Sequence, residues 1–185
     1  MSASPAGAAG RMRRAWIVAI ALCACSATAS AGDAVETSGD VLRAVIPLVA
    51  YGVAWKRDDD EGRRQFAWAF GGTVVSTLAL KEIVDDEGPE GQSNAFPSGH
   101  AATAFAGAAF LQRRYGWRTA WPAWLGAAYT GWTRLDADEH DAADVLAGAA
   151  LAAAWNWWLV EPAEGPVVQP VVDADTVGVR VDWRF

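Results

Sequence analysis

The sequence predicts an all-α bundle of five to six helices, embedded in a membrane and followed by a short β-like C-terminal tail. Three observations indicate this class. Apolar segments of helical length alternate with joints that are charged or rich in Gly and Pro. Basic residues are concentrated on alternate joints, and several of the eleven tryptophans fall near segment ends. The length of 185 residues suits a single domain.

Residues 1–31 are predicted to be a signal peptide or a first membrane helix. Basic residues precede an apolar run at 15–24, and the small residues Ala29-Ser30-Ala31 favour cleavage after Ala31. An uncleaved membrane helix and a lipoprotein acylation site at Leu22-Cys23-Ala24-Cys25 are the alternatives. Each takes the chain out of the cytoplasm. Cys23 and Cys25 both lie in this leader, so a cleaved chain would have neither a disulfide nor a thiolate metal site.

Residues 32–162 are predicted to form the helical core. The first helix ends at the charged run 56–60, the second is free of charge between Arg64 and Lys81, and the third stops at Arg113-Arg114-Tyr115-Gly116. Gly88-Pro89 and Gly91 predict a loop over 85–96. The expected helices are 40–55, 65–80, 98–112, 117–133 and 145–160.

The charge distribution favours a membrane over a soluble bundle. A helix of about 16 residues spans only about 24 Å, short of the roughly 30 Å of a hydrocarbon core, so length alone suits either. If the leader's arginines point inward, the inner joints carry most basic residues and the outer joints only Lys81 and Arg134. This positive-inside pattern predicts a bacterial inner membrane protein with its active site facing the periplasm. A soluble periplasmic bundle is the alternative.

The tail at 163–185 has a different composition. Its valines are β-branched, and a turn is expected at 173–176, so a small hairpin is predicted.

The formal net charge of −7 argues against a nucleic-acid partner. Oligomeric state cannot be derived from these patterns.

The two histidines, His100 and His140, each begin an apolar helix on the predicted outer side. Pro97-Ser98 predicts a helix start, so the amides of Ser98, Gly99 and His100 would face outward as an anion site that Gly99 leaves open. Lys81 and Arg134 would add positive charge. Asp144 lies four residues after His140, on the same helical face, where its carboxylate can fix the imidazole tautomer.

These residues resemble the signatures of the type-2 phosphatidic acid phosphatase and vanadium haloperoxidase superfamily. "PSGH" at 97–100 is similar to the second signature, and "TRLDADEHDAAD", with Arg134, His140 and Asp144, is similar to the third. Lys81 followed by Pro89 resembles the first. The resemblance covers roughly residues 40 to 160 and is closest to small bacterial members that act on lipid phosphates.

The resemblance implies a phosphatase that hydrolyses a phosphomonoester or pyrophosphate, with a lipid phosphate as substrate and no metal or cofactor. It implies that His140 attacks phosphorus to form a phosphohistidine while Asp144 holds the ring. His100 would protonate the leaving oxygen. The phosphoryl oxygens would be bound by Lys81, Arg134, Ser98 and the Gly99 amide. A haloperoxidase that holds vanadate in the same pocket is a third interpretation.

The sequence departs from the first signature at Gly88, where the family has an arginine. A non-catalytic relative that binds lipid phosphate is therefore the second hypothesis. Arg43, on the outer side of the first helix, is a candidate substitute; the alternative is an arginine that pairs with Asp40 or extends to the surface. Thr133 replaces the leading serine of the third signature. The acidic loop 136–141 is interpreted as solvated, with a cation site as its alternative.

Overall fold

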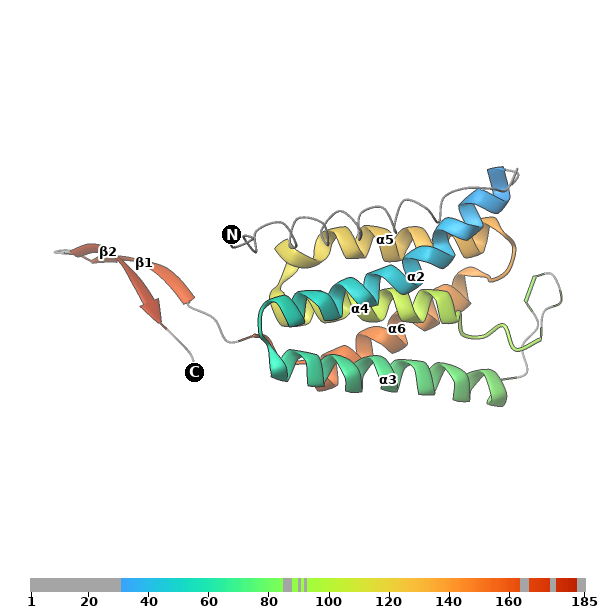
Figure 1. Cartoon of the computed structure of the whole chain (residues 1–185), viewed down its shortest axis with the longest axis horizontal. Helices are drawn as coiled ribbons and strands as arrows, with labels where there is room; N and C mark the ends of the chain where they lie inside the picture. The colour runs from blue at the N-terminus through green and yellow to red at the C-terminus, as the bar shows by residue number, and fades with distance from the viewer. Residues whose placement is uncertain are drawn as a thin grey trace, which may run out of the picture. The chain divides into compact units, whose positions relative to one another are not determined.

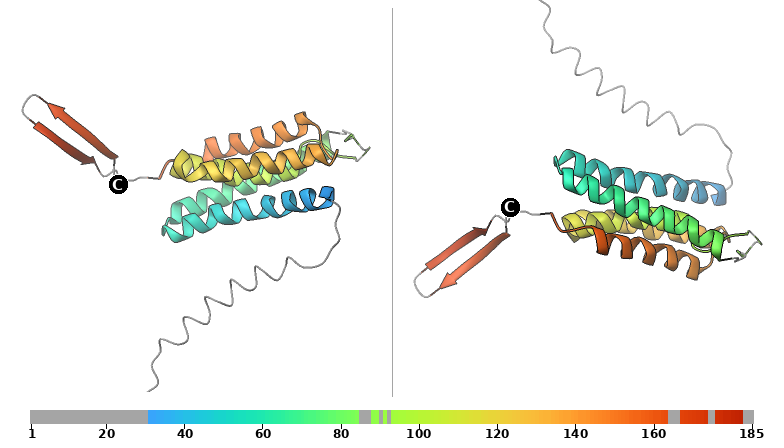
Figure 2. Two further views of the ribbon diagram at one scale, coloured as in Figure 1. Left: turned by 90° about the horizontal axis from the view of Figure 1, so that it is seen from above. Right: turned by 90° about the horizontal axis from the view of Figure 1, so that it is seen from below.

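The structure is a computed structural model that describes residues 31–84, 88–89, 91, 93–163, 167–173 and 176–182. This part of the chain contains five helices and one hairpin, and successive helices run in opposite directions (Figures 1 and 2). The prediction of an all-α bundle of five to six helices is confirmed, with five helices in the described residues. The predicted leader falls outside them, apart from Ala31. The elements are α2 (Ala31–Lys56), α3 (Asp60–Ile83), α4 (Gly99–Tyr115), α5 (Trp117–Asp136), α6 (Ala142–Leu159), β1 (Val167–Asp173) and β2 (Thr176–Asp182). The strands pair antiparallel, with Val167 opposite Asp182.

All five helices extend beyond the expected ranges at one end or both, and at the starts of α3 and α6 a polar residue caps the extended end. The Asp59 side chain accepts a hydrogen bond from the Gly62 amide and starts α3. Asp141 starts α6 in a capping box with Asp144. Gly116, at φ 81°, adopts the left-handed conformation that ends α4.

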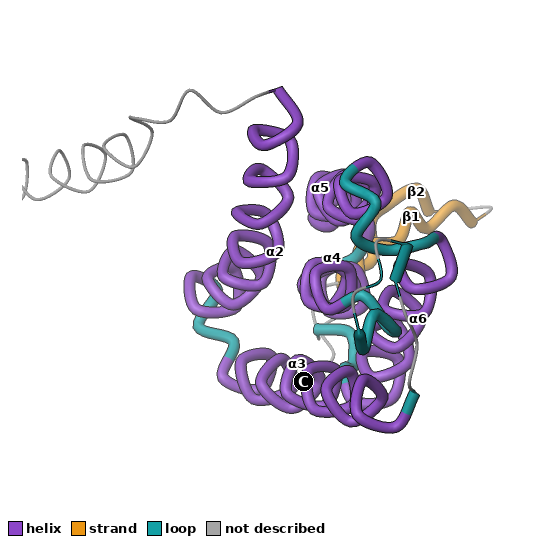
Figure 3. Tube along the Cα trace, turned by 90° about the vertical axis from the view of Figure 1, so that its right-hand side faces the viewer, coloured by secondary structure: helices purple, strands orange, loops and turns teal. Residues whose placement is uncertain are grey.

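The helix α4 occupies the centre of the bundle, and the other four surround it (Figure 3). Its buried side chains are mostly alanines, which let neighbouring backbones approach. A Cβ at Gly107 would lie 2.9 Å from the Pro47 backbone, and one at Gly148 would lie 2.6 Å from the Ser98 carbonyl oxygen. Glycine is thus needed where α2 and α6 cross α4. Gly71, in contrast, faces open space.

The outer surface of the bundle carries many large apolar side chains. The tryptophans predicted to form an interfacial belt are all exposed rather than packed in the core: Trp55, Trp117, Trp132, Trp157 and Trp158. By length and apolarity, none of the helices in the described ranges qualifies as a membrane span.

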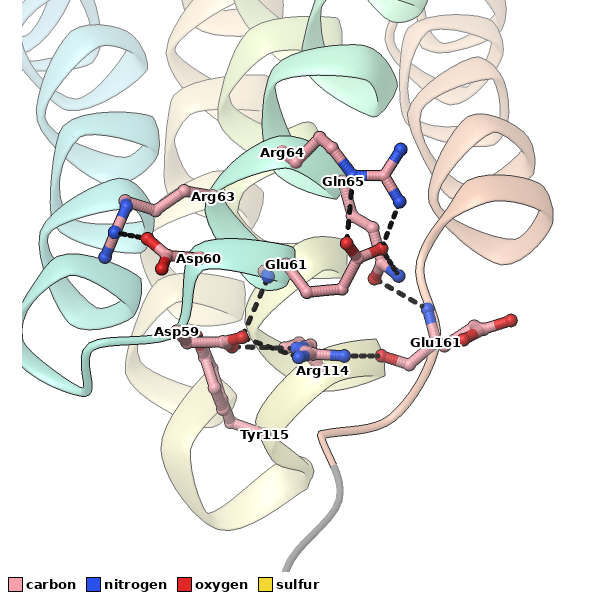
Figure 4. Close-up of polar contacts among 10 residues, drawn as sticks. Asp59, Asp60, Glu61, Arg63, Arg64, Gln65, Arg114, Tyr115 and Glu161 are labelled. Atoms are coloured by element: carbon pink, nitrogen blue, oxygen red, sulfur yellow. Dashed lines mark hydrogen bonds and ion pairs between the residues drawn. The ribbon is translucent and has the colours of Figure 1, made fainter. Parts of the chain in front are cut away.

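A buried ion pair closes the end of the bundle where α3 begins and α4 ends (Figure 4). Arg114 donates to the Asp59 carboxylate from Nε at 2.8 Å and from Nη2 at 2.6 Å, and Tyr115 Oη donates to it at 2.7 Å. The hydrogen bond from Arg114 is the main cause that lowers the pKa of Asp59 to about 2. Arg114 Nη1 also donates to the Glu161 carbonyl, so this cluster joins α3 and α4 to the segment after α6.

Candidate active site

The predicted catalytic and phosphate-binding residues gather at the opposite end of the bundle, the right-hand end in Figure 1. The alternating helix directions bring together the end of α3, the start of α4, the end of α5 and the start of α6. These termini carry Lys81, His100, Arg134 and His140. The Ser98 amide, just before α4, donates to the Asp144 carbonyl of α6 at 3.1 Å, which fixes two of the termini together.

His140 is oriented by Asp144, as the four-residue spacing predicted. Its Nδ1 lies 3.2 Å from Asp144 Oδ2, and the Asp144 residue is 2% exposed. With the proton on Nδ1, the ring donates to this carboxylate and leaves the Nε2 lone pair available as a nucleophile. Burial lowers the pKa of His140, while the Asp144 carboxylate opposes that shift. The neutral, nucleophilic ring is therefore favoured.

The start of α4 forms the predicted anion site with one difference. Gly99 and His100 occupy the first two helical positions, whose amides have no acceptor within the helix. A Cβ at Gly99 would meet no atom within 4 Å, so the space over this turn is open. The Ser98 amide is occupied, because it donates to the Asp144 carbonyl. The buried Ser98 hydroxyl oxygen caps the helix by accepting a hydrogen bond from the Ala101 amide at 3.4 Å. The expectation of three outward amides is therefore wrong for Ser98.

Lys81 holds the loop that leads into α4. Its Nζ donates to the carbonyl oxygens of Asn94 at 2.7 Å and Ala95 at 3.1 Å. Burial lowers the pKa of Lys81, and the nearby Asp144 carboxylate opposes this shift. The ammonium group also contributes to lowering the pKa of His140. Lys81 thus acts electrostatically on the same His140–Asp144 pair.

His100 has a carboxylate partner that the sequence did not reveal. Its Nε2 lies 2.7 Å from Asp40 Oδ1, and Arg134 Nη1 lies 3.7 Å from the same oxygen. The pKa of His100 is lowered, chiefly by burial and then by the charges of Arg43 and Arg134; Asp40 opposes the shift. From the sequence, Asp40, on α2, is predicted only as a possible partner of Arg43.

Arg134 is almost fully buried, at 1% exposed. Its Nη1 donates to Glu139 Oε2 at 2.7 Å, its Nη2 to the Glu36 carbonyl at 3.0 Å, and its Nε to Thr133 Oγ1 at 3.3 Å. The guanidinium is thus held at the site from three sides. Thr133 keeps the hydroxyl group of the serine that it replaces, and this hydroxyl accepts the hydrogen bond from Arg134 Nε.

The region of the missing arginine is partly described. Gly88 is buried, and its carbonyl accepts from the Gly91 amide at 2.8 Å. The acidic residues 85–87 lie outside the described residues. Arg43 is exposed on α2, close enough to His100 for its charge to affect the histidine's pKa. This location is compatible with the prediction that Arg43 takes the place of the arginine missing at Gly88.

One member of the acidic loop after α5 is engaged within the site. Glu139 turns to Arg134, and no group of three or more His, Cys, Asp or Glu side chains in the described ranges could hold a metal ion. No sequence pattern predicts this pairing, because in the sequence Glu139 is simply one member of an acidic cluster.

Several known proteins resemble this chain in sequence or in fold. A family model described as the PAP2 superfamily matches residues 59–162. A lipid A 1-phosphatase of Porphyromonas gingivalis is 45% identical over 67 residues, which are 34% of this chain and 15% of that protein. A lipid A 4'-phosphatase of Helicobacter pylori is 41% identical over 132 residues, 63% of this chain and 65% of that protein. The chain thus covers less than two thirds of each relative's length.

A solved structure shows the same fold. The crystal structure of Aquifex aeolicus LpxE matches with a TM-score of 0.52 and 20% sequence identity. The match covers 65% of this chain and 84% of that chain.

Proposed function

The chain belongs to the PAP2 superfamily, and from this membership we propose that it is a phosphatase that hydrolyses a phosphomonoester or pyrophosphate of a lipid. The observation that carries the proposal is the pairing of both histidines with carboxylates at one end of the bundle. His140 is paired with Asp144, and His100 with Asp40. Lys81 and Arg134 supply the positive charge around them.

In the proposed reaction, His140 Nε2 attacks phosphorus while the bond to the leaving oxygen breaks. Asp40 engages His100 at Nε2, which leaves Nδ1 as the nitrogen that gives its proton to the leaving oxygen. Water then attacks the phosphohistidine, its proton returns to His100, and phosphate leaves with His140 regenerated. None of these steps requires a metal ion.

The same residues would stabilise charge on the phosphoryl oxygens. The amides of Gly99 and His100 lie at the N-terminus of α4, where they would donate to a bound phosphoryl group. The positive end of the helix dipole would stabilise the same negative charge. Arg134 is preorganised by its contacts with Glu36 and Thr133, so little reorganisation is needed on binding. Phosphate would compete with Glu139 for Nη1 of Arg134.

An apolar groove beside the site supports a lipid substrate. Its volume is about 510 Å³, and it begins at Arg43 and Thr103, the latter one turn along α4 from His100. Leu48 and Tyr51 of α2 and Phe66 and Phe70 of α3 also line it. A hydrocarbon chain in this groove would leave its phosphate at the α4 N-terminus. The names of the two curated relatives also favour a lipid phosphate. We propose accordingly that the protein acts at the bacterial inner membrane with its active site facing the periplasm.

The test is phosphate release from a panel of lipid phosphates. The panel comprises phosphatidate, phosphatidylglycerophosphate, an isoprenoid pyrophosphate and lipid A phosphate, with a short soluble phosphomonoester as comparison. We expect release from at least one lipid, unaffected by a metal chelator, with a higher kcat/KM than for the short ester. If no lipid gives release above that of the His140→Ala blank, the proposed function is wrong.

A non-catalytic phosphate-binding relative is the second candidate, favoured by Gly88. We expect Gly88→Arg to raise the rate by up to about a hundredfold, since one added charge-assisted contact to the phosphoryl group is worth roughly that much. Ser93→Arg adds the same charge to an exposed position of the same loop and serves as the control. Activity absent both before and after the substitution would favour the binding protein.

The pH dependence of kcat/KM should report on both histidines. His100 must carry a proton, so activity falls as pH rises through its pKa, below the ordinary value of about 6.5. His140 must be neutral, so activity also falls as pH drops through its own lowered pKa. We therefore expect an optimum on the acidic side of neutrality.

Two substitutions should move the alkaline limb in opposite directions. Asp40→Asn removes a group that raises the pKa of His100, so the limb should shift to lower pH. Arg43→Gln removes a charge that lowers it, so the limb should shift to higher pH. Rate profiles against pH measure both shifts. Identical limbs in the two variants would rule out His100 as the acid.

A further inference from the structure

The guanidinium of Arg134 has an acceptor at each of its three nitrogens, and one of these acceptors is a carboxylate. Nε donates to Thr133 Oγ1 at 3.3 Å and Nη2 to the Glu36 carbonyl at 3.0 Å, while Nη1 donates to Glu139 Oε2 at 2.7 Å. The hydroxyl and the carbonyl are neutral, so Glu139 is the acceptor that carries negative charge. Asp40 Oδ1 lies farther from Nη1, at 3.7 Å. Glu139 thus occupies the nitrogen that a phosphoryl oxygen would need.

The loop after α5 fixes the backbone of Glu139 and leaves its side chain able to move. The amides of Glu139 and His140 both donate to the Arg134 carbonyl, at 3.1 and 3.2 Å. This turn holds the backbones of the cation, the carboxylate and the proposed nucleophile together. The Glu139 side chain is 32% exposed, so a change of rotamer can take its carboxylate from Arg134 into solvent. The backbone does not have to move.

Arg134 stays in position when Glu139 leaves, because its other two contacts remain. The Thr133 hydroxyl that accepts from Nε is itself fixed, since it donates to the Thr130 carbonyl at 2.8 Å. The Glu36 carbonyl belongs to the backbone of α2. Arg134 is 1% exposed, and a charge-assisted hydrogen bond is strong in such a buried place. The departure of Glu139 therefore leaves a fixed donor at Nη1 for an incoming anion.

The surroundings favour the return of Glu139 to Arg134. The hydrogen bond with Glu139, and then the charge of Glu139, raise the pKa of Glu36, so these two carboxyl groups are close neighbours. The charge of Arg134 opposes that shift, whereas Asp40 adds to it. A displaced Glu139 would stand beside Glu36 and a bound phosphate without its cation. Repulsion among these anions is relieved when phosphate leaves and Glu139 pairs with Arg134 again.

We propose that Glu139 is a placeholder anion, which occupies Arg134 in the free enzyme, gives way to the phosphoryl group of the substrate and displaces inorganic phosphate after hydrolysis. This role rests on the proposed phosphatase function, because that function supplies both the substrate and the product. Glu139 acts through Arg134, so it is a positioning residue. Loss of its carboxylate should strengthen the binding of phosphate, whereas loss of a phosphate-binding residue would weaken it.

Calorimetry with inorganic phosphate tests this role on the full-length protein without any lipid. We expect Glu139→Gln to bind phosphate about tenfold more tightly than the unchanged protein, because the neutral amide is a weaker competitor for Nη1. Asp138→Asn is the matched control, since it removes the same charge from an exposed neighbouring residue. Asparagine also tolerates the positive φ of 53° at this position. This control should change the affinity by less than about twofold, because solvent and salt screen the exposed charge.

Steady-state kinetics with a lipid that the enzyme hydrolyses provide a second readout. Inorganic phosphate should inhibit Glu139→Gln at about a tenfold lower concentration than it inhibits the unchanged enzyme, and kcat should not rise, because the product leaves more slowly. A merely structural defect would weaken phosphate binding and could not produce this gain. Thermal unfolding checks that the variant is folded, and Glu139→Ala repeats the comparison if it is not.

The two readouts separate this role from the phosphatase assignment. Tighter phosphate binding by Glu139→Gln in a protein that hydrolyses no lipid would support the displacement of Glu139 by phosphate and contradict the proposed function. Equal phosphate affinity in Glu139→Gln and Asp138→Asn, in an enzyme that still turns over, would overturn the placeholder role and leave the phosphatase assignment intact. Weaker phosphate binding by a folded Glu139→Gln protein would overturn it as well.

Discussion

Replacing His140 with alanine is expected to lower phosphate release from a lipid phosphate by roughly 10⁴-fold or more. Removal of the nucleophile from a covalent mechanism eliminates the route through the intermediate, and only background hydrolysis in the site remains. The other histidine cannot compensate, since His100 is held by Asp40 on a different helix. Initial rates at saturating lipid measure the effect.

The control separates chemistry from folding. Asp144→Asn keeps the nucleophile but weakens both the orientation of its ring and the capping box of α6, so it should lose less activity than His140→Ala. Both variants should bind inorganic phosphate, because Lys81 and Arg134 are unchanged. Substantial turnover by a folded His140→Ala protein would contradict the assigned nucleophile.

Replacing Asp59 with asparagine is expected to lower the free energy of unfolding by about 3–5 kcal/mol. The substitution leaves the Arg114 guanidinium buried without its anionic partner, and it weakens the acceptor that Tyr115 and the Gly62 amide share. The stabilisation by Asp59 should be complete above its unfolded pKa of about 3.9. It should be lost as pH falls through its folded pKa of about 2.

Denaturant titration measures this loss, and the chain offers a matched control. Asp60 is the next residue and pairs with Arg63, but its side chain is 89% exposed (Figure 4). Exposed pairs contribute at most about 1 kcal/mol, so Asp60→Asn should change stability very little. Equal effects of Asp59→Asn and Asp60→Asn would refute the role of the buried pair.

The helices were predictable because their apolar runs are long and are separated by charge or glycine. Two of their starts were less so, because Asp59 and Asp141 cap them with side chains that lie outside the apolar pattern. The helix α3 begins at Asp60 instead of residue 65, and α6 begins at Ala142 instead of residue 145.

The active-site residues on α3 to α6 were predictable from motif and spacing, whereas those that reach the site through tertiary packing were not. His140 lies just before Asp141, the cap of α6, and not on the helix as expected, but Asp144 is in the first turn of α6, so the contact between them is still local. Asp40 and His100 are 60 residues apart in sequence, and no local pattern connects them. The same reason explains why the sequence predicts a free Ser98 amide at the phosphate site. That amide is occupied by the Asp144 carbonyl of α6, which is a tertiary contact.

The central claim, a covalent phosphohistidine at His140, is tested most directly by trapping the intermediate. A lipid substrate labelled in its phosphoryl group is mixed with the enzyme, quenched in alkali within the first turnover, and digested for mass spectrometry. We expect one phosphoryl group per chain, stable in alkali, labile in acid and located on His140. Rapid turnover with no label on the protein, or with the label on any other residue, would contradict the mechanism.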